Sequence, residues 1–567
     1  MRDGTFTTDR LLALYGRVAG AEDAIPRLRR FVLDLAVRGK LVEQDPADEP
    51  VKSVGLEIVA KKRGQMLETI DEPFELPRGW AWRAIDTISN QVTDGEHSTP
   101  PRISEHEVPL VTAKNVREGF MDYDNTDWVG AETAAKAWTR CRPQVGDLLL
   151  VCVGATTGRL TVLREHRDMV LVRSVALIRP SSAVNPEYLE RAIRSPMGQK
   201  QIWAGVKAAA QPCLYINRIK SIFIPLPPLA EQQRIVAKVD ELMALCDRLE
   251  ATRAGREAVR DRLTAATWAR LTGPETDAET FPTHARFALQ TLSTLTTRPD
   301  QIKALRQAIL NLAVRGKLVE QDPTDEPAAE LLRRINAAHP RQKKIQDNKV
   351  SVPSQLADGW SVAHLDALAN FENGDRSSNY PSGSDIKSAG IPFFSTKNLA
   401  DHRLHFSNLD FITDEKFASL RSGKLVDRDI LITLRGSVGK FGLFEATPLI
   451  STGFINAQLM IIRCADLAIV PYVLRFMQSG IFSEQIKRLS SGSATPQLSA
   501  GKLGEAELWL PPLAEQHRIV ARVDALMALC DQLAASLTTA TTSRSRLLEA
   551  LLHEALEPRA RAMEAAE

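Results

Sequence analysis

Apolar residues recur in two segments of the chain at the spacing of a long helix. They step by four and three residues in turn at Ile235, Val239, Leu242, Cys246 and Leu249, and again at Ile519, Val523, Leu526, Cys530 and Leu533. This 3.5-residue period is typical of a coiled-coil seam. No Pro interrupts residues 229–270, so we expect one helix of about 60 Å there at 1.5 Å per residue. The alternative is an ordinary amphipathic helix packed on a globular core.

A second apolar pattern predicts strands. Short apolar runs separated by Gly-bearing loops lie at 148–153, 161–165, 175–180, 429–434 and 458–463. Helical patterns at 186–200 and 471–488 lie in the same two stretches. The expected fold class is α+β, with two mixed α/β domains separated by long antiparallel coiled-coil helices. The α/β domains are expected at 76–226 and 351–510, and helical regions at 1–75, 227–350 and 511–567.

The chain contains an internal repeat. Residues 33–50 recur at 310–327 with two differences in 18 positions, and residues 227–249 recur at 511–533 with four differences in 23. The offsets are 277 (310 − 33) and 284 (511 − 227) residues, so the chain consists of two tandem halves. The segments between the repeats have diverged. Each half therefore reads as a near-identical helical frame around a variable α/β domain, related by an internal pseudo-two-fold repeat.

The repeated segment at 33–50 predicts the end of a helix. The helix should end at Arg38, because Gly39 suits the position just after a helix, and Gly316 marks the equivalent point in the second half. Helices before and after each α/β domain are expected to pack into a bundle. The central region should contribute two long antiparallel helices with a break near Thr272–Thr283.

Length and composition restrict the class of protein. The 567 residues suffice for three or four domains, and 44% hydrophobic with 25% charged residues is typical of a folded globular protein. A net charge of +2 excludes a bulk polycation and leaves room for a local basic groove. No apolar run is long enough to span a bilayer, and the N-terminus lacks a signal-peptide pattern. We therefore expect a cytoplasmic protein.

The cysteines are few and scattered. The six cysteines form no CxxC pair, which argues against a disulfide framework or a structural zinc site and fits a reducing compartment. Cys246 and Cys530 occupy equivalent seam positions in the two halves. We expect both to be small core residues and not reactive thiols.

The sequence contains no recognisable catalytic motif. Residues 436–440 read GSVGK, which lacks the GxxxxGK[ST] spacing of a phosphate-binding loop. There is no HExxH, no dinucleotide-binding glycine pattern and no NPPY-like motif of amino-methyltransferases. The glycines of 154–158 and 436–440 predict tight turns instead. For His97, alone in a polar loop, a hydrogen-bonding or DNA-contacting role is favoured over a metal ligand or base. We expect no catalytic residue and no metal site.

These motifs resemble the specificity subunit of type I restriction-modification systems over nearly the whole chain. The most specific are LPPLAEQxRIVA in both halves, LAVRGKLVEQDP twice, and TDGEHSTPPR followed by PLVTAKNV in the first α/β domain. GDLLLVCVGATTG (146–158) and ILITLRGSVGKFG (430–442) resemble the strand–turn motif of the family. The second domain departs from the pattern, because NGDRSSNYPS (373–382) replaces the DGxHxTP form.

The resemblance implies a DNA-recognition subunit that performs no chemistry itself. Each α/β domain would be a target recognition domain. The repeated helices would dock two methyltransferase subunits, and two motor-nuclease subunits would complete the restriction enzyme. No cofactor is expected on this chain, whereas S-adenosylmethionine, ATP and Mg are expected on the partner subunits.

Two different recognition domains on matching frames suit an asymmetric, bipartite site in double-stranded DNA with an uncontacted gap. The long helices would act as a ruler for that gap. One extra helical turn of four residues lengthens a helix by about 6 Å, so such an insertion should widen the preferred gap by about one or two base pairs. Methylation mapping would report the change.

Base reading is expected from loop side chains in the major groove, with Arg or Lys on guanine and Asn or Gln on adenine. The candidates are Arg102, Lys114, Asn115, Arg159, Lys207, Gln211 and Asn217 in the first domain, and Arg376, Asn379, Lys397, Asn398, Arg435, Lys440, Arg488 and Gln497 in the second. Lys114-Asn115 and Lys397-Asn398 are equivalent in two domains that should read different sequences. We therefore expect these pairs to touch phosphates or to hold the fold.

Partner binding is expected on the exposed face of the two frames. The matching residues are Glu231, Gln232, Arg234 and Lys238 in one frame and Glu515, Gln516, Arg518 and Arg522 in the other. Identity of exposed residues is hard to explain by packing alone. Descent from a recent duplication is the alternative explanation.

Three other functions compete with this interpretation. One is a specificity subunit of a related bifunctional restriction-methylation enzyme, which the neighbouring genes would distinguish. Another is a coiled-coil scaffold that joins two proteins without touching DNA, which a salt-dependent gel shift would exclude. A self-sufficient enzyme is disfavoured by the missing motifs.

Overall fold

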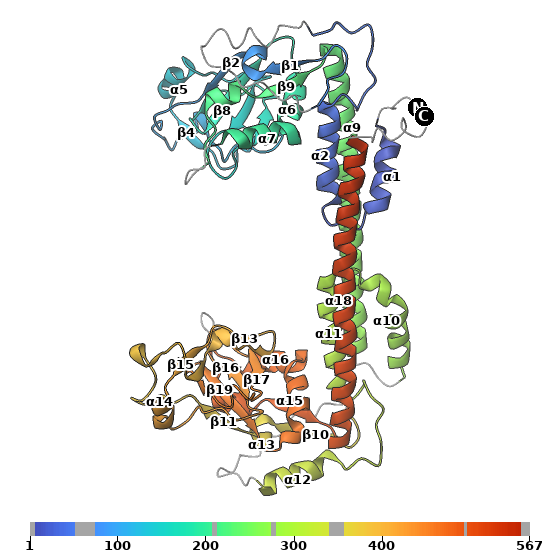
Figure 1. Ribbon diagram of the computed structural model, residues 1–567, viewed down its shortest axis with the longest axis vertical. Helices are drawn as coiled ribbons and strands as arrows, with labels where there is room; N and C mark the ends of the chain where they lie inside the picture. Colours follow the sequence, from blue (N-terminus) through green and yellow to red (C-terminus); the bar gives the residue numbers. More distant parts are fainter. Residues whose placement is uncertain are drawn as a thin grey trace, which may run out of the picture. The chain divides into compact units, whose positions relative to one another are not determined.

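The computed structural model describes residues 6–51, 74–206, 212–273, 279–338, 356–492 and 496–556 (Figure 1). The chain divides into two compact units. Unit 1 comprises Met1–Arg256 and Ala540–Glu567, and unit 2 comprises Glu257–Thr539. Each unit contains one α/β domain and one bundle of helices, which we call its frame. The mixed helix-and-sheet fold with a twofold internal repeat agrees with the class predicted from the sequence.

Two 44-residue helices belong to both units. Helix α9 (Leu229–Thr272) begins in unit 1 and ends in unit 2, and α18 (Leu513–Leu556) begins in unit 2 and ends in unit 1. The predicted continuous helix over 229–270 is confirmed. Each helix starts directly after a Pro-Pro pair, whose second carbonyl accepts the first helical hydrogen bond, from Gln232 and from Gln516, both at 2.9 Å.

The frame of unit 1 is built from α1 (Thr8–Val18), α2 (Ala24–Val37) and the portions of α9 and α18 that lie in this unit. Their apolar faces share one core. The predicted seam residues Ile235, Val239, Leu242 and Cys246 of α9 are buried in it, with Leu28 and Leu35 of α2 and Leu548 and Leu552 of α18. Helix α2 ends as predicted, with Gly39 at φ 65° just beyond it.

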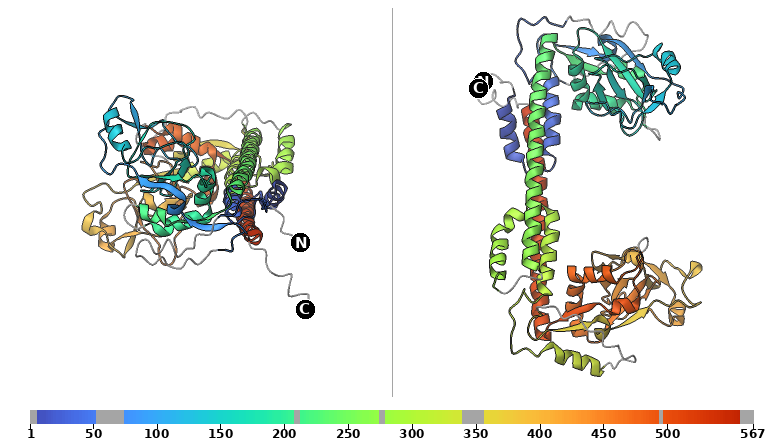
Figure 2. Two further views of the ribbon diagram at one scale, coloured as in Figure 1. Left: turned by 90° about the horizontal axis from the view of Figure 1, so that it is seen from above. Right: turned by 180° about the vertical axis from the view of Figure 1, so that it is seen from behind.

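The frame of unit 2 is built from its portions of α9 and α18 together with α10 (Phe281–Leu295) and α11 (Pro299–Ala313), and α12 (Ala328–Ala338) follows (Figure 2). The predicted break after Thr272 is confirmed. The expected second long helix is wrong, because 281–313 forms two helices separated at 296–298. Gln301 explains the new start, since its side chain accepts from the backbone N–H groups of Thr297 and Arg298 at 2.9 and 3.2 Å.

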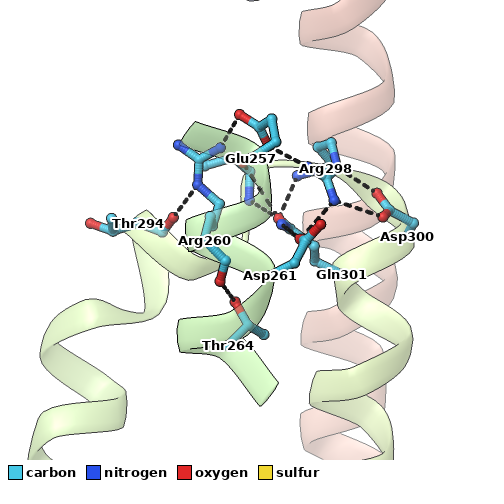
Figure 3. A network of polar contacts seen from close by, with 9 residues as sticks. Glu257, Arg260, Asp261, Thr264, Thr294, Arg298, Asp300 and Gln301 are labelled. Carbon is cyan, nitrogen blue, oxygen red and sulfur yellow. Dashed lines mark hydrogen bonds and ion pairs between the residues drawn. The ribbon is translucent and has the colours of Figure 1, made fainter. Parts of the chain in front are cut away.

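A polar network fixes that break to α9 (Figure 3). The guanidinium of Arg298 bonds Glu257, Asp261 at 2.8 Å and Asp300 at 3.1 Å, and the amide of Gln301 donates to Asp261 at 3.0 Å. The hydrogen bond that Arg298 donates to Asp300 is the main reason that the pKa of Arg298 is raised. The turn between α10 and α11 is therefore held by α9 through charged hydrogen bonds.

Domain 1, the α/β domain of unit 1, contains three sheets. Their strand orders are β1-β9, β2-β8-β5-β6 and β4-β3-β7. The strands are β1 (Ala81–Ala84), β2 (Ser89–Asp94), β3 (Val108–Val111), β4 (Asp127–Val129), β5 (Leu148–Val151), β6 (Leu160–Val162), β7 (Val170–Leu171), β8 (Val175–Pro180) and β9 (Phe223–Leu226). The helices are α4 (Ile85–Ile88), α5 (Ala131–Trp138), α6 (Pro186–Arg194), α7 (Pro196–Gly205) and α8 (Ile216–Lys220).

Domain 2, the α/β domain of unit 2, repeats this topology as β10-β20, β11-β19-β16-β17 and β15-β12-β18, with an added hairpin β13-β14. Its strands are β10 (Ser361–His364), β11 (Ala369–Asn373), β12 (Ile391–Phe394), β13 (Leu399–Ala400), β14 (Arg403–Leu404), β15 (Asp410–Ile412), β16 (Ile430–Thr433), β17 (Phe441–Leu443), β18 (Phe454–Ile455), β19 (Leu459–Cys464) and β20 (Glu507–Leu510). Its α-helices are α13 (Leu365–Leu368), α14 (Asp414–Ser419), α15 (Val470–Met477), α16 (Gly480–Leu489) and α17 (Ala500–Gly504).

The five predicted strands lie where expected, but both predicted helices of these domains are split. The helix expected at 186–200 is α6 followed by α7, and that at 471–488 is α15 followed by α16. The cause is a serine at each junction. Ser195 accepts from the N–H of Gly198 at 3.2 Å and Ser479 from that of Phe482 at 3.3 Å, so each caps a new helix.

No helix within the described ranges is long and apolar enough to cross a membrane.

Candidate nucleic-acid interface and partner-facing frame

A hollow of about 530 Å³ opens in domain 1. Three cations line it, namely Arg140, Arg173 and Lys220, and the carboxylate among its lining residues is Asp94. The remaining lining residues are Val92, Thr93, His97, Cys152, Val153, Cys213, Leu214, Tyr215, Ile216 and Asn217. A concave surface that gathers cations with exposed polar side chains suits an anionic ligand such as a nucleic-acid backbone.

The loop after β2 forms one wall of the hollow. A Cβ at Gly95 would lie 2.1 Å from the backbone oxygen of Leu171, so only glycine permits this approach. Glu96 then pairs with Val172 in a parallel bridge. Gly374 is the equivalent in domain 2, where a Cβ would lie 2.6 Å from the oxygen of Ile455. The glycine shared by the DGEHST and NGDRSS loops therefore allows the loop backbone to lie directly against the backbone of β7 in domain 1 and of β18 in domain 2.

Asp94 organises the polar groups of this wall. Its carboxylate accepts from Nη2 of Arg140 at 2.5 Å and lies 3.0 Å from Nε2 of His97, and its carbonyl accepts from Nε of Arg140 at 3.3 Å. The hydrogen-bonding role predicted for His97 is thus observed. No cluster of three potential metal ligands exists within the described residues.

Arg173 and Asn217 reach the hollow from other elements. Arg173 lies in the turn between β7 and β8, and Asn217 lies on α8; both side chains are exposed. Lys220 is committed to Asp86 at 3.1 Å. Arg173 has no side-chain partner within the part of the chain that the structure describes.

Few of the residues predicted to read DNA in domain 1 lie at the hollow. Asn217 does. Arg102 and Lys114 share the carboxylate of Asp127 at 3.4 and 3.3 Å, and Arg159 is half-buried. Lys207 and Gln211 lie outside the described residues.

Asn115 and Asn398 hold the fold, which is one of the two roles expected for the Lys-Asn pairs, and their burial removes them from the candidate base readers. Each is 1% exposed. Asn115 accepts from the N–H of Thr112 at 2.9 Å and donates to the carbonyl of Asp122 at 3.0 Å. Asn398 accepts from the N–H of Ser395 at 2.9 Å. Asn398 also donates to the carbonyl of Ser407 at 3.3 Å. Because each amide is buried in a turn with both its oxygen and its nitrogen bonded, neither is available to a base.

The candidates of domain 2 are largely exposed. Arg435 and Gln497 face each other in an antiparallel bridge, and both side chains are exposed, as are those of Lys440 and Arg488. Arg376 donates to the carbonyl of Ala457 at 3.2 Å. The two other candidates are Asn379, which donates to the carbonyl of Ser419 at 3.2 Å, and Lys397, which pairs with Asp410 at 2.8 Å.

The frame residues Glu231, Gln232, Glu515 and Gln516 are buried, which corrects the expectation that they form an exposed docking face. Glu231 and Glu515 are 1% exposed, and Gln232 and Gln516 are fully buried. Glu231 accepts from the indole N–H of Trp80 and Glu515 from that of Trp360, both at 3.0 Å. Burial raises the pKa of both carboxyls. Their identity in the two halves follows from packing.

The cationic members of the predicted docking set do reach solvent. Arg234 pairs with Asp48 at 2.5 Å and Arg518 with Asp325 at 2.7 Å, each side chain remaining 37% exposed. Lys238 pairs with Glu241 at 2.8 Å, and Arg522 is exposed. These four residues keep the surface position expected of them.

The cysteines behave as core residues. Cys246 and Cys530 are buried among the apolar side chains of their frames, which raises the pKa of both thiols, that of Cys246 to about 11. Burial also raises the pKa of Cys152, beside the hollow, to about 12. These thiols stay protonated at neutral pH and are poor nucleophiles.

Sequence reasoning missed Arg140, Arg173 and Lys220. Each lies outside the glycine-bearing motifs, and the fold brings them to the hollow from three separate segments, namely just beyond the end of α5, the turn between β7 and β8, and α8. One signal was available. Arg173 lies in the short connection between two buried apolar strands, which is where a turn exposes a side chain.

Comparison with known proteins gives a consistent result. The family model described as type I restriction modification DNA specificity domain matches residues 150–255 and 357–539. The chain is 28% identical over 581 residues to the EcoAI specificity subunit of a type I restriction enzyme from Escherichia coli, and 29% identical over 591 residues to the EcoEI specificity subunit from the same species. Each alignment covers 94% of both proteins.

A solved structure also resembles this chain in fold. It is described as showing the complex assembly and conformational transition of the type I R-M system. The match covers 85% of this chain and 99% of the solved chain, at 18% identity and a TM-score of 0.50.

Proposed function

Because this chain belongs to the family of type I restriction modification DNA specificity domains, we propose that it recognises the DNA target of a type I restriction-modification complex. In this proposal domain 1 and domain 2 each read one half of a bipartite, asymmetric site in double-stranded DNA. The chain is a specificity subunit and not itself the catalyst.

The observation that carries the proposal is the contrast between shared topology and different surface chemistry. The two domains have the same strand order, and the close backbone contacts of Gly95 and Gly374 are equivalent. The exposed polar side chains differ, with Arg173 close to Gly95 in domain 1, and Arg435 and Gln497 at another position of the same topology in domain 2. One scaffold with two sets of polar contacts suits two different DNA half-sites.

The frames are proposed to dock two methyltransferase subunits and, through them, two motor-nuclease subunits. Arg234, Lys238, Arg518 and Arg522 are the candidate contacts, because they match between the frames and reach solvent. S-adenosylmethionine, ATP and Mg would bind those partners. Matching exposed cations on two frames suit two copies of one partner.

The experiment uses the complex of this chain with its methyltransferase partner. Binding to duplex DNA that carries the methylated site should weaken steeply as salt rises, because phosphate contacts release counterions. Exchanging domain 1 for that of a relative with another target should change one half of the modified site and leave the other intact. If the complex binds DNA no better than the partner alone, the chain is a protein scaffold; if exchange leaves both halves unchanged, recognition lies elsewhere.

A further inference from the structure

We propose that the hollow of domain 1 is where this unit reads a guanine of its half-site, with Arg173 as the reading side chain and Arg140 as a fixed phosphate contact. This inference rests on the proposed function and names the residues and the base.

The backbone that carries Arg173 is held rigidly. Its N–H donates to the carbonyl of Glu96 at 2.9 Å, directly after the bridge between Glu96 and Val172 and the close contact of Gly95 with Leu171. Its side chain is exposed and unpaired within the described residues. A fixed backbone with an unengaged guanidinium leaves both terminal nitrogens free for the O6 and N7 atoms of guanine.

Arg140 differs because its guanidinium is already committed. Nη2 and Nε are bonded to Asp94, and Nη2 also lies 2.9 Å from Nε2 of His97. Nη1 is the one nitrogen of this guanidinium without a partner within the described residues. The bidentate contact with guanine needs two nitrogens of the guanidinium fork, and Arg140 has only Nη1 left, which suits a phosphate oxygen, whose contact carries no sequence information.

The remaining lining supports a nucleic-acid strand. Tyr215 is 47% exposed and, with Ile216 and Leu214, gives the hollow an apolar side beside its cations. Asn217 adds an exposed amide. This mixture of cations, one aromatic ring and an amide matches the combination of phosphate, sugar and base edge in a nucleotide.

Domain 2 shows that the fold does not require an arginine at position 173. The equivalent residue is Ala457, since Val172 and Asn456 donate in the same way to Val111 and Phe394. Domain 2 carries Arg435 and Gln497 where domain 1 has Val153 and Cys213, because both pairs form the same antiparallel bridge. The polar groups thus stand at different positions of the shared topology in the two domains, which suits readers of different sequences.

The test uses the complex with the methyltransferase partner and a library of duplexes randomised in both half-sites. For Arg173→Ala we expect about a tenfold to hundredfold loss of preference for guanine at one position of one half-site, with the other half-site unchanged. Arg173→Lys keeps the charge and loses the bidentate geometry, so the same preference should fall while the salt dependence is retained. Arg140→Ala should weaken binding to all sequences alike and reduce the slope of log affinity against log salt by about one.

Arg167→Ala is the matched control. Arg167 is exposed in the same domain, lies 4.1 Å over the ring of Tyr123 and is outside the hollow, so preference should stay unchanged. If Arg173→Ala retains both half-sites while the wild-type complex binds DNA with strong salt dependence, this inference is wrong and the proposed function stands. If the wild-type complex shows no such binding, both are wrong.

Discussion

The two frames share the ion pairs that join their segments and differ in the apolar side chains that fill their cores. Asp48 holds Arg234 in unit 1 as Asp325 holds Arg518 in unit 2, and Arg29 and Arg306 bond Asp247 and Asp531 at 2.7 and 2.5 Å. These residues match at the repeat offsets. Polar contacts with fixed geometry have therefore been kept in both copies.

The apolar filling has changed between the copies. In unit 1, Phe31 of α2 is 3% exposed and its ring lies 5.2 Å from that of Phe6. The equivalent of Phe31 in unit 2 is Ala308, which lines an apolar groove of about 320 Å³ between α9, α10, α11 and α18. Directional bonds constrain sequence more strongly than volume does, because a core tolerates changes of shape that a hydrogen bond does not.

The largest effect is expected from removing the ring that unit 1 has and unit 2 lacks. Phe31→Ala should destabilise the frame of unit 1 by about 3–5 kcal/mol, since it deletes a buried ring and leaves a cavity. Hydrogen exchange of the α2 amides would measure the loss, and the α11 amides should stay unchanged. Phe120→Ala, at a ring 60% exposed in domain 1, is the control. A loss below about 1 kcal/mol would mean that the site collapses to fill the space.

The sequence predicted the frames well because their pattern is local. The steps at Ile235, Val239 and Leu242 report one buried helical face, and all three are buried. It failed at the break between α10 and α11, which depends on Gln301 and on contacts of Arg298 with α9. Those partners are about 40 residues apart along the chain, so no local pattern indicates them.

The candidate site was less predictable for the same reason. Asn217 was selected because an amide side chain suits a base contact, although it lies on α8 and not in the loop that was expected. Arg173 comes to the hollow through the pairing of β7 and β8 with strands distant in sequence, and Arg140 through its bonds to Asp94, 46 residues away. Glu231 and Gln232 were misplaced because identity between copies was taken as a sign of surface function, whereas Trp80 and Pro227 supply buried partners for them.

The next largest effect is expected from Arg435 of domain 2, whose equivalent in domain 1 is Val153. Arg435→Ala should reduce discrimination at one position of the half-site read by domain 2 by about 1–3 kcal/mol, because Arg435 is the exposed cation where domain 1 has Val153. Methylation mapping on randomised duplexes is the measurement, with Lys487→Ala, 73% exposed and paired with Glu484, as control. Unchanged discrimination would mean that other side chains of domain 2 read the bases.

A smaller effect is expected on the stability of domain 2 at low pH, through Asp375. The carboxylate of Asp375 in domain 2 accepts from the N–H groups of Ser377 and Arg421 at 2.7 and 2.8 Å, and these bonds lower its pKa from 3.8 to about 2. Because the folded pKa is depressed, its stabilisation is present above about pH 4 and is lost as pH falls towards 2. Asp375→Asn should cost about 1–2 kcal/mol at pH 7, the range of a side chain that caps backbone N–H groups.

Denaturant unfolding of wild type and Asp375→Asn across pH 2–7 would show the gap in stability closing towards pH 2. Asp124→Asn in domain 1 changes an exposed carboxylate and is the control. A gap that stays constant with pH would show that the cost comes from the lost geometry and not from the charge.

The smallest effect is expected where the two domains are alike. Lys114 pairs with Asp127 at 3.3 Å and Lys397 with Asp410 at 2.8 Å, with both lysines at least 40% exposed. Exposed pairs contribute little, so Lys114→Met or Lys397→Met should change stability by less than about 1 kcal/mol. If these lysines contact phosphates, each change should also lower the salt slope of DNA binding by about one and leave the preferred sequence intact. Lys136→Met, exposed and paired with Glu132 in domain 1, should leave the slope unchanged. If all three variants keep the salt slope of the wild type, Lys114 and Lys397 do not contact phosphates and the Lys-Asn pairs are purely structural.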